Sequence, residues 1–257
     1  MEPEKVPEKL KNPIDFKILL LIFIAGIGIY FTLDNLAEDE AGLLAFILSV
    51  TIASTVSAVS FIVAKRYWHT HVFGRAYLSL GLGFLSYAVA EILYYTFELI
   101  LGIPAYPSIA DVFFFALYPF VLIHLILNTR FFIKRFSSRA KFWIPLIPLS
   151  FVVIYAYTAL IELGEPNFNF YYGIIFLCGA STTLSFAILG ASIFRKGVLG
   201  VAWLLLVIGI LTNAIGDLWY YYLELVGAYY DAHPVTVVWY VSNLIMVYAL
   251  YKHQKII

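Results

Sequence analysis

Two acidic side chains lie well inside apolar segments of this chain, and their type and position suit them to chemistry. Glu91 falls within an apolar run over residues 76–101, and Asp217 falls within another over residues 198–226. An unpaired carboxylate is costly in a hydrocarbon environment, so acids in such places commonly carry protons, bind ions or fix a ligand. A functional account of the chain therefore has to explain this pair.

The two acids occupy equivalent positions in a repeated stretch. Residues 200–225 restate residues 74–99 at a constant offset of 126, with eleven of the 26 positions identical and Asp217 opposite Glu91. Each copy also carries polar side chains at intervals of three or four residues, which places them on the acid's helical face. These stripe residues are Tyr87, Tyr94 and Tyr95 in the first copy and Asn213, Tyr220 and Tyr221 in the second. We expect both carboxyls to be neutral or hydrogen-bonded to such groups, with Glu98 and Glu224 at the rim.

The composition places these stripes in a membrane. Of the 257 residues, 63% are hydrophobic and 12% are charged, whereas soluble domains are about 25% charged. A run of about 20 apolar residues spans a hydrocarbon core of about 30 Å. The sequence therefore predicts an all-α integral membrane protein with eight transmembrane helices. The expected spans are residues 15–33, 42–64, 76–101, 109–129, 142–163, 170–194, 198–226 and 235–251.

The repeat predicts how these helices are organised. Residues 15–129 form a first four-helix repeat and residues 142–251 a second, joined by a basic cytoplasmic linker over residues 130–141. Residues 1–14 and 252–257 are tails. Since both repeats begin on the same side, they are parallel and related by a pseudo-two-fold axis along the membrane normal. The two polar stripes are expected to face a shared centre, with Asn243 of the eighth span as a further polar group.

The distribution of charged residues predicts how the chain is oriented in the membrane. All sixteen Lys and Arg lie within residues 5–17, 65–75, 130–141, 195–196 or 252–255, whereas the alternate connections carry acids and no basic residue. Positive residues flank membrane spans on the cytoplasmic side. Both termini are therefore predicted to be cytoplasmic in a multi-pass protein of the cell membrane, which an even number of spans also requires. We interpret the basic connections as topology signals and expect no nucleic-acid partner.

A motif at the start of the fourth span carries a family resemblance. Residues 107–119 include Pro107, Ser108, Ala110, Asp111, Phe113, Tyr118 and Pro119. This group resembles the pattern P-S-x-A-D-x-F-Y-x-x-x-Y-P of the N-terminal multi-helix membrane sensor segments of bacterial diguanylate cyclases and histidine kinases. The likeness covers residues 74–129 and, more loosely, 198–251. It departs from the pattern at Phe114, where the family usually has Tyr, and at Val237 or Val238, where an acid is common.

The resemblance implies a sensory or ligand-binding membrane module, here standing alone without a cyclase or kinase output domain. In such segments acids commonly occupy the positions of Glu91 and Asp217. Together with the two polar stripes, this resemblance makes Asp111 and Tyr118 candidate ligand-binding residues. Signalling would require a cytoplasmic partner chain.

Three functional classes remain open, beside a structural role in docking the two halves. The first is a receptor whose outward-facing, tyrosine-lined cavity between the repeats binds a small molecule or lipid. The second is a transporter or proton-coupled carrier that uses the paired acids. The third, an intramembrane hydrolase, is disfavoured because His124 lies about 10 Å in depth from Glu91 by helical rise, so no catalytic residues are assigned. His69 and His71 lack further ligands for a metal site, and the sequence names no cofactor.

Overall fold

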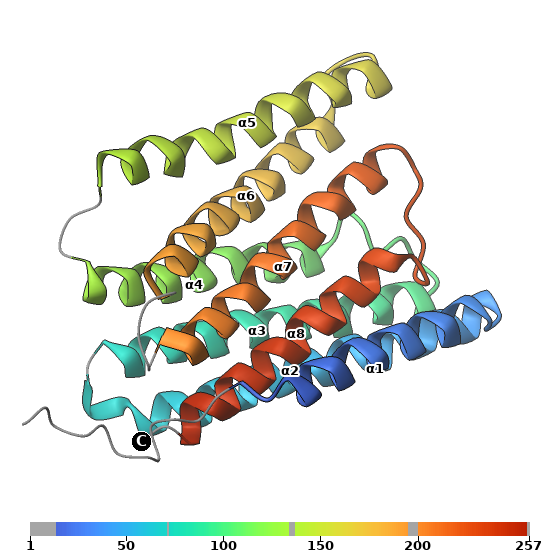
Figure 1. The fold of residues 1–257 in the computed structure, drawn as a ribbon. Helices are drawn as coiled ribbons and strands as arrows, with labels where there is room; N and C mark the ends of the chain where they lie inside the picture. Colours follow the sequence, from blue (N-terminus) through green and yellow to red (C-terminus); the bar gives the residue numbers. More distant parts are fainter. Residues whose placement is uncertain (1–13, 71, 134–136, 195–199, 256–257) are drawn as a thin grey trace, which may run out of the picture.

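A computed structural model describes residues 14–70, 72–133, 137–194 and 200–255 of the chain, and Figure 1 shows its fold. Those residues form eight long helices, as predicted. The helices are α1 (Phe16–Asp34), α2 (Glu38–Arg66), α3 (Phe73–Tyr95), α4 (Ile109–Phe132), α5 (Ser138–Leu163), α6 (Phe168–Phe194), α7 (Gly200–Leu225) and α8 (Pro234–Lys255). A short helix η2 (Trp68–Thr70) precedes α3, and a π-helical turn η3 (Thr96–Ile100) extends it.

Each of the eight helices is long and apolar enough to cross a membrane. They run roughly parallel or antiparallel to one another in a single bundle (Figure 1). Only 11% of the most apolar segment of α1 and of α5 is buried, against 67% for α7 and 56% for α3 with its π-helical turn. The repeated helices α3 and α7 are therefore central, while α1 and α5 present most of their apolar surface outward, as lipid contact requires.

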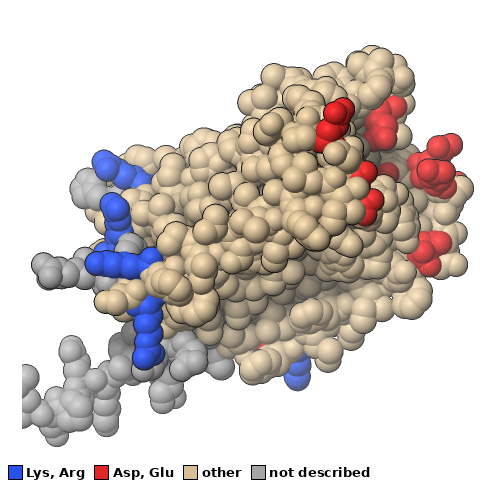
Figure 2. All heavy atoms as spheres, turned by 90° about the horizontal axis from the view of Figure 1, so that it is seen from above, with Lys and Arg blue, Asp and Glu red and all other residues tan. Residues whose placement is uncertain are grey.

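Charged residues gather at opposite ends of the bundle. Figure 2 shows acidic side chains at one end and most of the visible Lys and Arg side chains at the other. We call the first the acidic end; it carries the α1–α2, α3–α4, α5–α6 and α7–α8 connections. Gly164 and Gly227 end α5 and α7 there with positive φ angles of 75° and 63°, a conformation that glycine adopts without steric cost.

Close helix contacts surround α3 and α7. Helix α3 packs against α2 and α4, and α7 packs against α6 and α8. A Cβ on Gly83 of α3 would lie 3.0 Å from the Cβ of Phe120 on α4, and a Cβ on Gly209 of α7 would lie 3.0 Å from the Ser242 carbonyl oxygen on α8. Small residues permit such approach between membrane helices. Three further contacts, α2 with α8, α4 with α6 and α1 with α8, join the first four helices to the last four.

Helix α1 has its main contact with α8 rather than with its neighbour in sequence, α2. Gly26 faces Val241 of α8, where an added Cβ would collide with a Val241 methyl group. The Asp15 N–H before α1 donates to the Tyr248 hydroxyl at 2.8 Å. Helix α5, by contrast, packs against the next helix, α6.

A buried aromatic and histidine cluster closes the other end, the basic end, between α3, α4, α7 and α8. Tyr77 is fully buried, and its hydroxyl lies 2.9 Å from His253 Nδ1. Its ring also packs against Trp203 and His124, with centroids 5.7 and 5.3 Å away. His124 Nδ1 donates to the Ala76 carbonyl at 2.9 Å. The interior at this end is therefore filled by packed side chains, although His253 Nε2 has no hydrogen-bond partner among the described residues.

Candidate functional site

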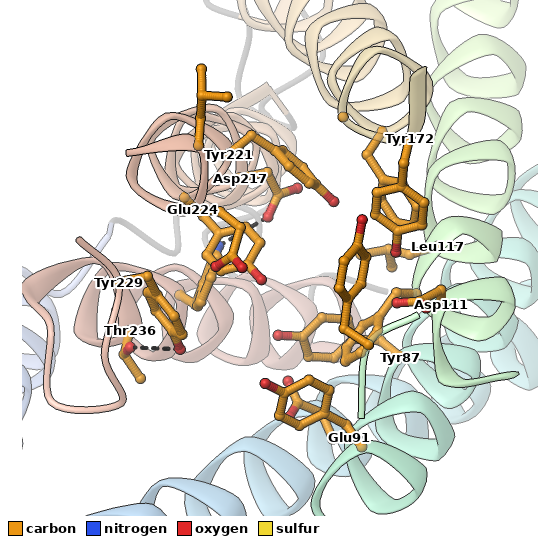
Figure 3. A pocket seen from close by; sticks show the side chains of 18 of the residues that line it. Tyr87, Glu91, Asp111, Leu117, Tyr172, Asp217, Tyr221, Glu224, Tyr229 and Thr236 are labelled. Carbon is orange, nitrogen blue, oxygen red and sulfur yellow. Dashed lines mark hydrogen bonds between the residues drawn. The ribbon is translucent and has the colours of Figure 1, made fainter. Parts of the chain in front are cut away.

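A cavity of about 300 Å³ lies at the acidic end of the bundle, with walls from α2 through α8. Figure 3 shows its side chains pointing from the surrounding helices into a common space. Ten tyrosines and five acids line it. The acids are Glu91, Asp111, Asp217, Glu224 and Asp231.

Nine of the eleven residues that the sequence nominated for a ligand site line this cavity. They are Glu91, Asp217, Tyr87, Tyr94, Tyr95, Tyr220, Tyr221, Asp111 and Tyr118. They come from α3, α4 and α7, so the fold does bring the two stripes and the motif of residues 107–119 to one place.

The other two nominated residues, Asn213 and Asn243, are buried outside the cavity lining. Asn213 donates to the Ser242 hydroxyl at 3.3 Å and borders a small void of about 10 Å³ that also touches Asp217 and Tyr118. The Asn243 side-chain oxygen has no hydrogen-bond donor among the described residues. A void of this size holds about one water molecule, so Asn213 contributes to packing beneath the cavity.

Glu91 is the most buried acid of the cavity, with 7% of its surface exposed. Helix α3 places it one turn after Tyr87, and both side chains line the cavity. Tyr87 also lies close enough to Asp217 for the two to interact electrostatically. Tyr87 therefore lies near both repeated acids in the cavity lining.

Asp217 projects into the cavity from α7, on a different wall from Glu91 (Figure 3). Its Oδ1 accepts a hydrogen bond of 2.9 Å from the indole Nε1 of Trp239 on α8, and the Tyr118 hydroxyl is a further neighbour. The uncharged indole N–H of Trp239 thus holds this carboxyl in place while it continues to face the cavity.

The repeated Tyr and Glu residues at the ends of α3 and α7 behave differently in the two copies. Tyr94 precedes Glu98 by one helical turn, as Tyr220 precedes Glu224. Glu224 lines the cavity as an exposed rim residue, as predicted, whereas Glu98 is exposed outside it. Glu98 belongs to the π-helical turn η3, whose extra residue per turn rotates the following side chains away from the α-helical face.

The α7–α8 connection adds a fifth carboxyl, that of Asp231. Burial raises its pKa, the Tyr95 hydroxyl opposes that shift through a 3.5 Å hydrogen bond to Oδ1, and nearby Glu38 adds to it. Burial likewise raises the pKa of Tyr106 in the α3–α4 connection to about 12. No described cation in the cavity lining opposes either shift.

Asp111 has a clear structural task at the start of α4. Its Oδ2 accepts the Ser108 N–H at 2.6 Å, while the Ser108 hydroxyl accepts the Ala110 N–H at 3.1 Å, within a capping box. This arrangement satisfies backbone donors that the helix itself leaves free. The motif over residues 107–119 therefore fixes the N-terminal end of α4 in the cavity wall.

Substituting Ser108 by alanine tests that task. We expect the free energy of unfolding to fall by about 1 kcal/mol, since a lost N-cap costs about that much. Thermal unfolding in detergent measures the loss. Ser150→Ala is the matched control, because the exposed Ser150 hydroxyl bonds only the Leu146 carbonyl of its own helix; equal losses in the two variants would contradict the capping role.

Sequence reasoning missed much of the cavity wall. The missed residues include Tyr106, Tyr155, Asn169, Tyr172, Tyr229, Asp231 and Trp239. Most of them lie in connections or on α5 and α6, outside the repeated stretch. Asp231 had one usable signal, because it is the acid of the α7–α8 connection. The tyrosines on α5 and α6 carry none, since only tertiary packing distinguishes them from the interfacial aromatics common in membrane helices.

The donor set of the cavity restricts its chemistry. Among the described residues, no three His, Cys, Asp or Glu side chains converge as metal ligands, and no His, Lys or Arg lines the cavity. His69 lies in η2, away from the cavity lining, and His71 is outside the described residues. The arrangement of acids, phenols and aromatic faces suits reversible binding. No family model matches the chain, and comparisons with curated proteins and solved structures likewise give no match.

Proposed function

We propose that this polytopic membrane protein is a receptor-like module that binds a small molecule in the cavity at its acidic end. The observation that carries the proposal is the convergence of ten tyrosines and five acids from most of the bundle on one space of about 300 Å³. Binding sites are typically concave, with apolar and aromatic walls and a few convergent polar groups. The resemblance of residues 107–119 to bacterial sensor segments favours the same function.

The proposed architecture is two parallel four-helix repeats with the cavity between them. Its support is a set of matched contacts: α2 packs against α8 as α4 packs against α6, and the equivalent glycines Gly83 and Gly209 make matching close contacts. The first helix of each half departs from this pattern, since α1 packs mainly on α8 and α5 on α6.

We further propose that the cavity opens to the outside of the cell and that both termini are cytoplasmic. The separation of basic and acidic residues between the two ends supports this orientation (Figure 2) through the positive-inside rule. A signalling partner would then contact the basic end. Helices α3 and α7 run from the cavity to that end.

The filled interior favours a receptor over a carrier. Between the cavity and the basic end, Leu80, Leu206 and Met246 are fully buried, and Tyr77 with its histidine partners closes the end itself. A carrier would have to separate these side chains in each cycle, whereas a receptor can bind from the acidic end alone.

A cavity-narrowing substitution tests the proposal. Leu163, the last residue of α5, lines the cavity and is half-buried. Leu163→Trp should reduce, by about tenfold or more, the small molecule that native mass spectrometry detects on the purified protein, because the larger side chain occupies ligand space. Leu160→Trp, on the exposed face of the same helix, is the matched control and should retain the molecule. A wild-type spectrum without any bound molecule, or equal retention in both variants, would contradict the proposal.

A further inference from the structure

We infer that the ligand of this cavity is a small organic cation, an ammonium or quaternary ammonium compound whose charged group sits between Glu91 and Asp217. This inference rests on the proposed binding function and specifies its ligand class. Four observations carry it: the sign of the charges, the partners of the two acids, the aromatic walls and the size of the space.

The charges that line the cavity have one sign. Five carboxyls face or border it, and its described lining includes no Lys, Arg or His side chain. An anionic ligand would meet repulsion from every titratable acid and find no compensating base. A cation would instead supply the counter-charge that the two deep acids lack, and in a space with little water that attraction is strong.

The partners of the two deep acids are neutral donors. Asp217 receives the Trp239 indole N–H at 2.9 Å, and Glu91 has the Tyr87 phenol as its neighbour. A carboxylate has about four acceptor positions, so these contacts leave acceptor capacity on both groups. Tyr87, Glu91 and Asp217 line the same cavity, so one positive charge in the space beside the Tyr87 ring can interact with both acids.

The walls around that space are aromatic. Tyr118, Tyr220 and Tyr221 line it together with Trp239, and the Tyr220 and Trp239 rings pack at a centroid distance of 5.4 Å. Aromatic faces attract cations, and clusters of them are the established way in which proteins recognise quaternary ammonium groups. A neutral polyol would use the carboxyls and phenols but not this attraction.

The size of the space argues for an organic cation rather than a metal ion. About 300 Å³ is at the lower end of the range of small-molecule sites. Among the described residues, no set of three potential metal ligands converges. The acids instead project from separate walls, as Glu91 and Asp217 do in Figure 3.

Paired probes test the charge directly. Choline is compared with the neutral alcohol in which carbon replaces its nitrogen, and putrescine is compared with butanediol. Binding to the detergent-purified full chain is measured by isothermal titration calorimetry at neutral pH. We expect at least one of the two cations to bind roughly tenfold or more tightly than its neutral counterpart, because both ion pairing and cation–π attraction depend on the charge.

Charge-neutralising variants then locate the cation. Glu91→Gln and Asp217→Asn should each weaken binding of that cation roughly tenfold or more while changing binding of its neutral counterpart little. Glu98→Gln is the matched control, because Glu98 lies on the same helical segment but outside the cavity lining, and it should bind like the wild type. Thermal unfolding of each variant shows whether it remains folded.

The outcomes separate this inference from the proposed function. If neither cation binds better than its neutral counterpart, or if Glu98→Gln weakens cation binding as much as Glu91→Gln and Asp217→Asn do, the organic-cation inference is wrong. Loss of a co-purifying molecule in Leu163→Trp would still support a ligand cavity in that case. If the two deep-acid variants unfold, the comparison of cations with neutral probes on the wild type alone decides the question.

Discussion

Replacing Gly209 by leucine is expected to lower the free energy of unfolding by about 3 kcal/mol or more, the range of severe overpacking. A single added Cβ would already lie 3.0 Å from the Ser242 carbonyl oxygen and 3.3 Å from the Met246 nitrogen, both backbone atoms of α8. Since backbone cannot rotate aside as a side chain can, helices α7 and α8 must separate. Thermal or denaturant unfolding in detergent measures the loss.

Glycine 28 provides the control for that prediction. A Cβ at Gly28 of α1 would meet no atom within 4 Å, so Gly28→Leu should leave stability nearly unchanged. Alanine gives a sharper comparison, because Gly→Ala favours a helix by about 1 kcal/mol. Gly28→Ala should therefore stabilise the protein or have no effect, whereas Gly209→Ala should destabilise it. Similar changes at both positions would refute close packing between α7 and α8.

Truncation of Tyr77 to alanine is expected to have the second large effect, a loss of about 3 to 5 kcal/mol, as for other large buried aromatics. The side chain is fully buried among Tyr67, His124, Trp203 and His253. Its removal leaves a cavity at the basic end and deprives His253 Nδ1 of a 2.9 Å partner. The unfolding midpoint in a denaturant series measures the change.

Two further variants divide the effect of Tyr77 into packing and hydrogen bonding. Tyr77→Phe keeps the ring but removes the hydroxyl. We expect it to lower the free energy of unfolding by about 1 to 3 kcal/mol, because a buried polar group is left without a hydrogen-bond partner. Tyr157→Ala on α5, where 69% of the side chain is exposed, should change stability little. A Tyr77→Ala variant as stable as Tyr157→Ala would show that the basic end is not closed as described.

The helices could be predicted from the sequence because membrane spans require long apolar runs. Their ends could not, since polar residues continue a helix beyond the hydrocarbon region. Helix α2 begins at Glu38 rather than residue 42, so that Glu38, Asp39 and Glu40 occupy its first turn, where acids interact favourably with the helix dipole. Helix α8 likewise continues to Lys255, beyond the expected end at residue 251.

The candidate site could be predicted in part, because polar residues at helical spacing share a face whatever surrounds them. The spacing of Glu91, Tyr87 and Tyr94 was sufficient for α3. It could not show that Tyr155 and Tyr172 of other helices complete the wall. Asn243 was included as a polar residue of the eighth span, yet the cavity is bordered by Trp239, one turn earlier on α8. A shift of four residues keeps the helical face but moves the side chain about 6 Å along the axis, beyond the cavity floor.

The contact between α1 and α8 has a consequence for biogenesis. Of the eight described helices, α1 is synthesised earliest, whereas the Tyr248 and Val241 side chains that contact it belong to α8, which is synthesised latest of the eight. Synthesis proceeds at about 5 to 20 residues per second, so roughly ten seconds or more separate the appearance of the two partners. During that interval α1 crosses the bilayer without its main neighbour, which its composition allows because no charged residue lies between Lys17 and Asp34. Helix α1, the earliest of the eight to be synthesised, is thus among the last of them to reach its final position in the bundle.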